Sequence, residues 1–300
     1  MRTLWKCFAL IASGLALAAH ATLSVFATVP EWGALAEELG GDKVKVYTAT
    51  SALQDPHRVE ARPSLIARLR SADLVLATGA ELEVGWLPLA VQQAGNAKVR
   101  PGTPGYFEAA AFVPLLGKPT RLDRSEGDIH PQGDPHIQTD ARNIGRVAEP
   151  LATRLAQLDP PNAAYYQARL KQFSERWSAA VAKWERAAAP LKGVPVVVQH
   201  KAFTYLIAWL GMNEVAALEP KPGMEPTTAH LSEVLATLER APAKMVLRSA
   251  YQGDRPSQWL AQRAKIAAVT LPFTVGGTDG AKDLFGLFDD TIQRLLKGIE

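Results

Sequence analysis

The sequence contains almost no cysteine. Among its 300 residues only Cys7 is a cysteine, and it lies within an N-terminal apolar run. A chain processed after that run would have no disulfide framework, no thiolate metal site and no cysteine nucleophile. Any metal ion would then have to be bound by histidine and carboxylate side chains.

Long apolar runs are missing as well. The first stretch, MRTLWKCFALIASGLALAAHAT, has two basic residues, an apolar run from Cys7 to Ala18, and then Ala19-His20-Ala21. About twelve apolar residues are too few to span a bilayer, which needs about twenty. The pattern is instead typical of a secretory signal peptide. We therefore expect residues 1–21 to be removed on export. Because Cys7 is not at the cleavage point, we expect no lipid anchor.

The chain also has little net charge. Its formal charge is +3, and the predicted signal peptide holds two basic and no acidic residues, which leaves +1 after processing. A nearly neutral chain gives little support to nucleic-acid binding by a basic surface, so we expect no nucleic-acid partner. A His-Glu-x-x-His motif and a nucleophile elbow are absent from the sequence, which disfavours the common classes of zinc and serine hydrolase.

Strand-like and helix-like segments alternate along the chain. The stretch TLSVFATVPEWGALAEELGGDKVKVYTAT predicts a strand, a helix ending at Gly40-Gly41, and a second strand. This alternation indicates an α/β fold with mainly parallel sheets flanked by helices. Residues 101–138 are rich in proline, glycine and charge and predict an exposed loop. Thr139 or Asp140 is then expected to cap a helix that runs to about Leu158.

One long amphipathic helix divides the chain into two lobes. Its apolar side chains recur at steps of three and four residues, the spacing of one helix face. They are Leu170, Phe173, Trp177, Val181, Trp184, Ala188 and Leu191. We expect an N-terminal lobe over residues 22–158, a rigid connecting helix over 159–191, and a C-terminal lobe over 192–300.

Three of the six histidines occupy similar positions in the predicted fold. His57 and His136 each follow an Asp-Pro pair, and His200 ends the predicted strand VPVVVQ. Such positions lie at the carboxyl edge of a parallel sheet, where open α/β folds bind ligands. A single histidine of this kind is more often structural, but three at equivalent positions favour a zinc site, because imidazole is a common zinc ligand.

A tetrahedral zinc site needs a fourth donor. Asp279 is our candidate, because it follows the last predicted strand in a loop whose glycines allow close approach. A simple turn aspartate is the ordinary alternative, and Asp283 could take the ligand role instead. Asp55 and Asp134 are candidates to orient the histidine rings. His130 lies in the irregular loop, where it could gather metal transiently or be merely solvated.

Three stretches carry a resemblance to a known family. They are DPHRVEARPSLIARLRSADLVLATGAELEVGWL, DPHIQTDARN and VVQHKAFTYL. With these motifs the chain, from about Thr22 to Glu300, resembles substrate-binding proteins of zinc and manganese ABC importers, the cluster A-I class, and within it the periplasmic zinc-binding type. Two lobes joined by one rigid helix are the fold that this resemblance implies.

The resemblance also implies a function. It makes His57, His136 and His200 the imidazole ligands and Asp279 the carboxylate ligand of a transported zinc ion in a monomeric, non-enzymatic protein. A membrane permease would be the partner, with a periplasmic metallochaperone as a candidate donor. Three imidazoles favour zinc over manganese. A manganese-binding member and an exported zinc hydrolase, with Asp279 or Glu60 as general base, are the alternatives. The chain has HIQTD where many relatives have a tryptophan, and it lacks their histidine-rich tract.

Overall fold

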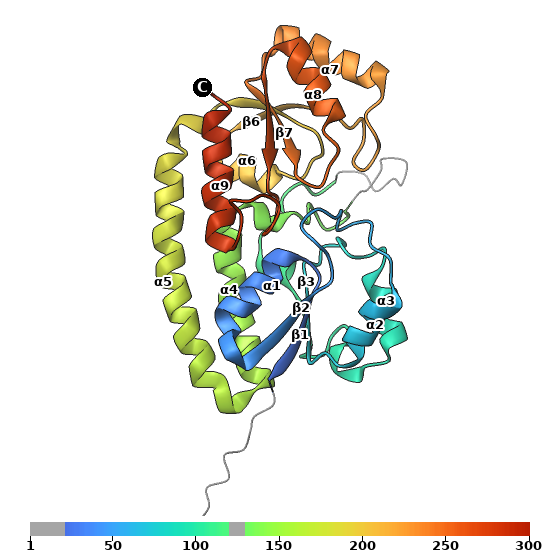
Figure 1. Cartoon of the computed structure of the whole chain (residues 1–300), viewed down its shortest axis with the longest axis vertical. Helices are drawn as coiled ribbons and strands as arrows, with labels where there is room; N and C mark the ends of the chain where they lie inside the picture. The colour runs from blue at the N-terminus through green and yellow to red at the C-terminus, as the bar shows by residue number, and fades with distance from the viewer. Residues whose placement is uncertain (1–21, 120–129) are drawn as a thin grey trace, which may run out of the picture.

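The computed structural model describes residues 22–119 and 130–300 as two α/β lobes stacked end to end (Figure 1). The predicted signal peptide, residues 1–21, lies outside the described residues. Each lobe contains one four-stranded sheet, in which all neighbouring strands are parallel. The expected fold class is therefore confirmed.

The sheet of the N-terminal lobe has the strand order β2-β1-β3-β4. Its strands are β1 (Leu23–Ala27), β2 (Val44–Thr48), β3 (Leu74–Ala77) and β4 (Tyr106–Glu108). The second sheet has the order β6-β5-β7-β8. Its strands are β5 (Pro195–Val198), β6 (Asn213–Ala217), β7 (Met245–Ser249) and β8 (Ala267–Leu271). In each sheet the second strand lies on one side of the first strand and the third strand lies on the other side. This change of side creates a crevice at the carboxyl edge of the sheet.

Helices cover the sheets because their apolar faces pack on the strands. In the N-terminal lobe they are α1 (Pro30–Gly40), α2 (Pro63–Arg70), α3 (Leu87–Ala94) and α4 (Ala141–Leu158). In the C-terminal lobe they are α6 (Thr204–Leu210), α7 (Thr228–Arg240), α8 (Arg255–Ala264) and α9 (Leu284–Lys297). The expected cap of α4 is Asp140, whose carboxylate accepts a hydrogen bond from the Arg142 backbone N–H at 2.8 Å.

The long helix α5 (Ala163–Ala187) runs along one side of both lobes (Figure 1). It begins four residues later than the expected start, because a short 3₁₀ turn at Pro160–Asn162 precedes it. It packs against α1 and α4 in the first lobe and against α9 in the second. The buried face of α5 is aromatic and consists of Phe173, Trp177 and Trp184, whose rings stack or meet edge to face. This face packs against Phe285 and Phe288 of α9.

The hydrophobic core continues from one lobe into the other. A single cluster of buried side chains includes Trp32 of α1, Trp177 of α5, Phe203 before α6 and Phe288 of α9. Densely packed interiors resist deformation. The two lobes are therefore held in a fixed relation by packing as well as by the connecting helix.

The predicted loop over residues 101–138 also contains two short elements. Strand β4 and a 3₁₀ turn at Ala109–Phe112 lie inside this range. A three-residue strand is too short to show the alternation by which a sequence reveals a strand. Within the described ranges, no helix combines the length and the apolar character needed to cross a bilayer.

Candidate metal centre

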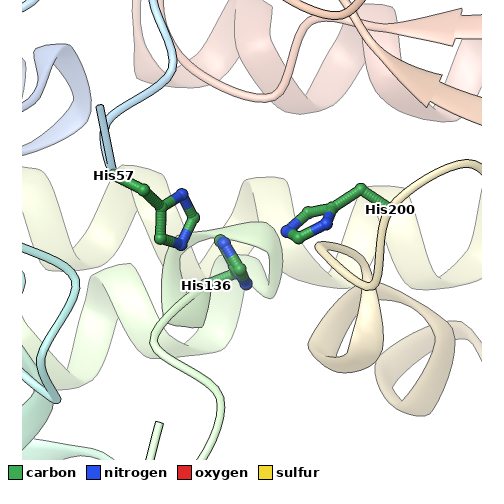
Figure 2. Close-up of side chains that lie close together, drawn as sticks. All are labelled: His57, His136 and His200. Atoms are coloured by element: carbon green, nitrogen blue, oxygen red, sulfur yellow. The ribbon is translucent and has the colours of Figure 1, made fainter. Parts of the chain in front are cut away.

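Three histidine rings meet between the two lobes (Figure 2). His57 lies in the loop after β2, His136 in the segment between β4 and α4, and His200 after β5. Each ring offers one nitrogen to a common point, and these three nitrogens lie within 4.8 Å of one another. The structure thus brings together the three histidines that the sequence placed at similar positions in the fold.

The two Asp-Pro-His tripeptides form the same local turn. In each, the aspartate Oδ1 accepts a hydrogen bond from the backbone N–H of the histidine two residues later, at 3.0 Å for Asp55 and 2.9 Å for Asp134. The same oxygen lies 2.9 Å from Nδ1 of His57 and 2.6 Å from Nδ1 of His136. An oxygen at Nδ1 holds the proton there, which leaves Nε2 as the free nitrogen.

His200 is oriented by a carboxylate that the sequence did not suggest. Its Nδ1 lies 2.7 Å from Oε2 of Glu219, which also accepts the backbone N–H of Gly223 at 2.8 Å. Glu219 follows β6, the neighbour of β5, so its place at the carboxyl edge of the same sheet was the available signal. All three rings are therefore held in the same manner, each by one carboxylate at Nδ1.

These carboxylates and burial set the protonation of the rings. Burial by itself would raise the pKa of Asp134, but the charge of His136 and hydrogen bonds from His136 and Thr204 lower it to about 2. Burial lowers the pKa of the His136 ring, against the opposing effect of Asp134. Burial also acts to lower the pKa of His200, yet the hydrogen bond and charge of Glu219 raise it above its ordinary value. His136 is thus neutral at pH 7, the form that binds metal.

Two of the nitrogens that face the common point are buried without a hydrogen-bond partner. Nε2 of His57 and Nε2 of His136 are buried and unpartnered among the described residues. A buried polar atom without a partner is costly, and such atoms in native proteins usually serve a ligand or an ion. Three convergent imidazole nitrogens are a donor set that suits a zinc site.

His130 lies beside this group. Its ring centroid is 5.4 Å from that of His57 and 6.4 Å from that of His136. Its Nδ1 is buried and has no hydrogen-bond partner. Burial, followed by the charges of His57 and His136, lowers the pKa of His130 to about 3, so this ring is also neutral.

Asp279 does not join the three imidazoles. The only group of potential ligand atoms found within the described ranges holds the three histidines and no carboxylate. Asp279 is exposed at the tip of a loop that is closed on itself, because the Gly276 N–H bonds to the Ala281 carbonyl at 2.6 Å and Thr278 bonds to Asp290 of α9 at 2.5 Å.

The glycines of this loop serve its own packing. A Cβ at Gly277 would lie 1.9 Å from the Pro272 carbonyl oxygen, and one at Gly280 would lie 2.7 Å from Asp290. Asp283, the alternative ligand, caps α9 by accepting the Gly286 N–H at 2.7 Å. The loop therefore turns both carboxylates to other surroundings, and its glycines allow close packing against Pro272 and Asp290.

Two hollows open on either side of the histidines. One, of about 340 Å³, is lined by His130, His136 and His200 together with Glu214. The other, of about 510 Å³, is lined by His57, His200 and Glu219 among others. His200 borders both hollows, so an ion could reach the rings from either one.

The protein has two α/β lobes joined by a rigid helix, and three histidines converge in the crevice between the lobes. These features define a two-lobed metal-binding protein of the kind that captures a small solute. Residues 25–298 match the profile of the family described as ZnuA, zinc-uptake complex component A, periplasmic. The chain belongs to this family, whose members are extracytoplasmic substrate-binding components of metal ABC transporters and not enzymes.

Individual relatives are similar at low identity. The manganese ABC transporter substrate-binding lipoprotein PsaA of Streptococcus mitis is 23% identical over 296 residues, which cover 96% of this chain and 91% of PsaA. A crystal structure of ZnuA superposes with a TM-score of 0.77 at 21% identity, covering 93% of this chain and all of the other. A manganese-bound periplasmic metal-binding protein of candidatus Liberibacter asiaticus superposes with a TM-score of 0.75 at 16% identity, with the same coverage.

Proposed function

We propose that the protein captures zinc in the periplasm and delivers it to the membrane permease of an ABC importer. The observation that carries this proposal is the cluster of His57, His136 and His200, with three nitrogens within 4.8 Å of one another. Family membership supports the transport role. We assign these three histidines as zinc ligands, and Asp55, Asp134 and Glu219 as the carboxylates that orient their rings.

The donor chemistry favours zinc over manganese. Imidazole nitrogen suits zinc, whereas manganese prefers carboxylate, carbonyl and water oxygen. PsaA of Streptococcus mitis is named for manganese, so a manganese-binding role for this chain is the alternative. Against it stands the absence of a carboxylate from the group of potential ligand atoms within the described residues.

The proposed delivery uses the stiffness of the fold. Because α5 and one continuous core join the lobes, wide hinge closure would disrupt dense packing. Capture would then involve small shifts of the loops that carry the histidines. Docking of both lobes on the permease would distort these loops and release the ion. A periplasmic metallochaperone is a candidate donor of zinc, and we expect the protein to act as a monomer.

The proposed location is free in the periplasm after removal of residues 1–21. The Streptococcus relatives are named as lipoproteins. In this chain the single cysteine lies inside the predicted signal peptide and not at its cleavage point. This difference supports a protein without a lipid anchor, and mass spectrometry of the exported chain would test it.

Competition with a chromophoric chelator tests the zinc proposal. The processed chain should bind one zinc ion tightly and manganese far more weakly. His200→Ala should weaken zinc binding, whereas His230→Ala should not, because His230 lies on α7 and its ring contacts Glu233 and the Ala217 carbonyl instead. Tighter binding of manganese than of zinc, or no stoichiometric zinc, would overturn the proposal. Peptidase or esterase turnover by the zinc-loaded protein would favour the hydrolase alternative.

A further inference from the structure

His130 lies beside the three rings, on the side from which a fourth imidazole could approach one ion. Two imidazoles on a tetrahedral zinc have ring centroids about 5.2 Å apart, since the Zn–N distance is about 2.0–2.1 Å. The pairs His57–His136, His136–His200 and His57–His200 have centroid distances of 5.2, 5.5 and 5.9 Å. His130 lies 5.4 Å from His57 and 6.4 Å from His136, so its ring would complete the set by moving toward His136 and His200.

A short turn holds His130 in this place. The Gly133 N–H donates to the His130 carbonyl at 3.0 Å, which closes the turn His130–Gly133. The next residue, Asp134, is bonded through its backbone N–H to the Leu116 carbonyl at 2.8 Å, and its own carbonyl accepts the Tyr205 hydroxyl at 2.7 Å. His130 is therefore tied to the backbone that carries His136.

Gly133 allows this turn to form. Its φ is +126°, a value that favours glycine. A Cβ at this position would lie 2.7 Å from the Leu116 carbonyl oxygen. A side chain at this position would therefore strain the turn that holds His130.

One ring nitrogen of His130 is buried without a hydrogen-bond partner, like one nitrogen each of His57 and His136. The nitrogen of His130 is Nδ1, and those of His57 and His136 are Nε2. Within the described residues, the ligand atoms that lie within 4.8 Å of one another belong to His57, His136 and His200 alone, so His130 would have to move inward to join them. We propose that Nδ1 of His130 is the fourth zinc ligand, in the place that the sequence assigned to Asp279, so that the site holds zinc by four imidazoles.

The surrounding charges suit an ion held by four neutral rings. Such rings leave the full +2 charge on zinc, which must be balanced nearby. Asp55, Asp134 and Glu219 each hydrogen-bond to one ligand ring. These three carboxylates supply that balance through the rings, without a carboxylate on the metal. A set of nitrogen donors alone would also select zinc against manganese.

This inference rests on the proposed zinc-binding function, and its test separates the two. X-ray absorption at the zinc edge of the loaded, processed chain should show four imidazole nitrogens, and the His130→Ala protein should show one fewer. Zinc affinity, measured by chelator competition, should fall about 10-fold or more in His130→Ala. Loss of a residue that only orients a metal ligand already lowers metal affinity by about this factor, and loss of a ligand should lower it at least as much. Asp279→Ala and the control His230→Ala should match the wild type in both measurements.

Two results would overturn the inference while leaving the zinc function intact. One is a wild-type protein that binds zinc with three nitrogens and an oxygen that disappears in Asp279→Ala. The other is a His130→Ala protein with wild-type affinity and an unchanged spectrum. A wild-type protein that binds no stoichiometric zinc would instead overturn the proposed function, and this inference with it.

Discussion

Replacement of Glu31 by glutamine should remove a pH-dependent cost to stability. Glu31 lies in the first turn of α1 and is only 1% exposed. Its carboxylate accepts a hydrogen bond from the Thr274 hydroxyl, beyond β8 in the other lobe. Burial raises the pKa of Glu31 to about 7, with a smaller contribution from the charge of Glu83, although the bond from Thr274 acts in the opposite direction.

The sign and size of the effect follow from this pKa. The folded chain holds a proton on Glu31 up to about pH 7, whereas the unfolded chain releases it near the ordinary value of 4.5. Stability is therefore fully present below pH 4.5 and is lost as the pH rises to about 7. The rise in pKa corresponds to about 3 kcal/mol. Glu31→Gln has no charge to bury and keeps an acceptor for Thr274, so it should be the more stable protein by up to about that amount at pH 8.

Urea unfolding at pH 5, 6, 7 and 8 measures this difference, with a chelator present so that metal binding does not contribute. The gap in free energy of unfolding between Glu31→Gln and wild type should be small at pH 5 and should widen with pH. Glu225→Gln is the matched control, because Glu225 is exposed. A gap that stays constant with pH, or one that narrows as the pH rises, would show that Glu31 is ionised in the folded protein throughout.

Three further predictions concern the site and the connecting helix. Glu219→Gln should weaken zinc binding about 10- to 100-fold in chelator competition, because Glu219 orients His200, while Glu225→Gln should have no such effect. Wild-type zinc affinity should fall on acidification, starting with protonation of His200, whose pKa is raised by Glu219. In Glu219→Gln the fall should begin at a lower pH, and an unchanged onset would contradict the assigned contact. Trp184→Ala should cost about 3–5 kcal/mol in thermal unfolding, because this buried ring joins α5 to α9; a loss below about 1 kcal/mol would mean that the helix is not held by this face.

Local signals in the sequence determined much of the architecture. The apolar residues at steps of three and four predicted the buried face of α5, and Phe173, Trp177 and Trp184 of that set are buried. The alternation of strands and helices predicted the parallel sheets. Such patterns are readable because a side chain's face on a helix or strand depends only on its neighbours in the chain. The three histidines could also be found from local signals, because His200 follows a predicted strand and His57 and His136 share the tripeptide Asp-Pro-His.

Only the tertiary structure decided which distant side chains complete the site. Glu219 meets His200, 19 residues earlier, because β6 lies beside β5. Glu31 meets Thr274 across 243 residues and two lobes. Neither contact has a local signature, since it depends on how whole elements pack.

The loops show most clearly that local sequence does not predict which distant residues come into contact. Asp279 and His130 both lie in loops rich in glycine and charge, and composition alone favoured the aspartate as a ligand. The fold closes the Asp279 loop on α9 and turns His130 toward His57. By itself the sequence determined the lobes, the connecting helix and three convergent histidines. Tertiary structure decided that Glu219 contacts His200 and that His130 lies next to the three rings. The reason is that the path of a loop depends on what its ends and side chains contact.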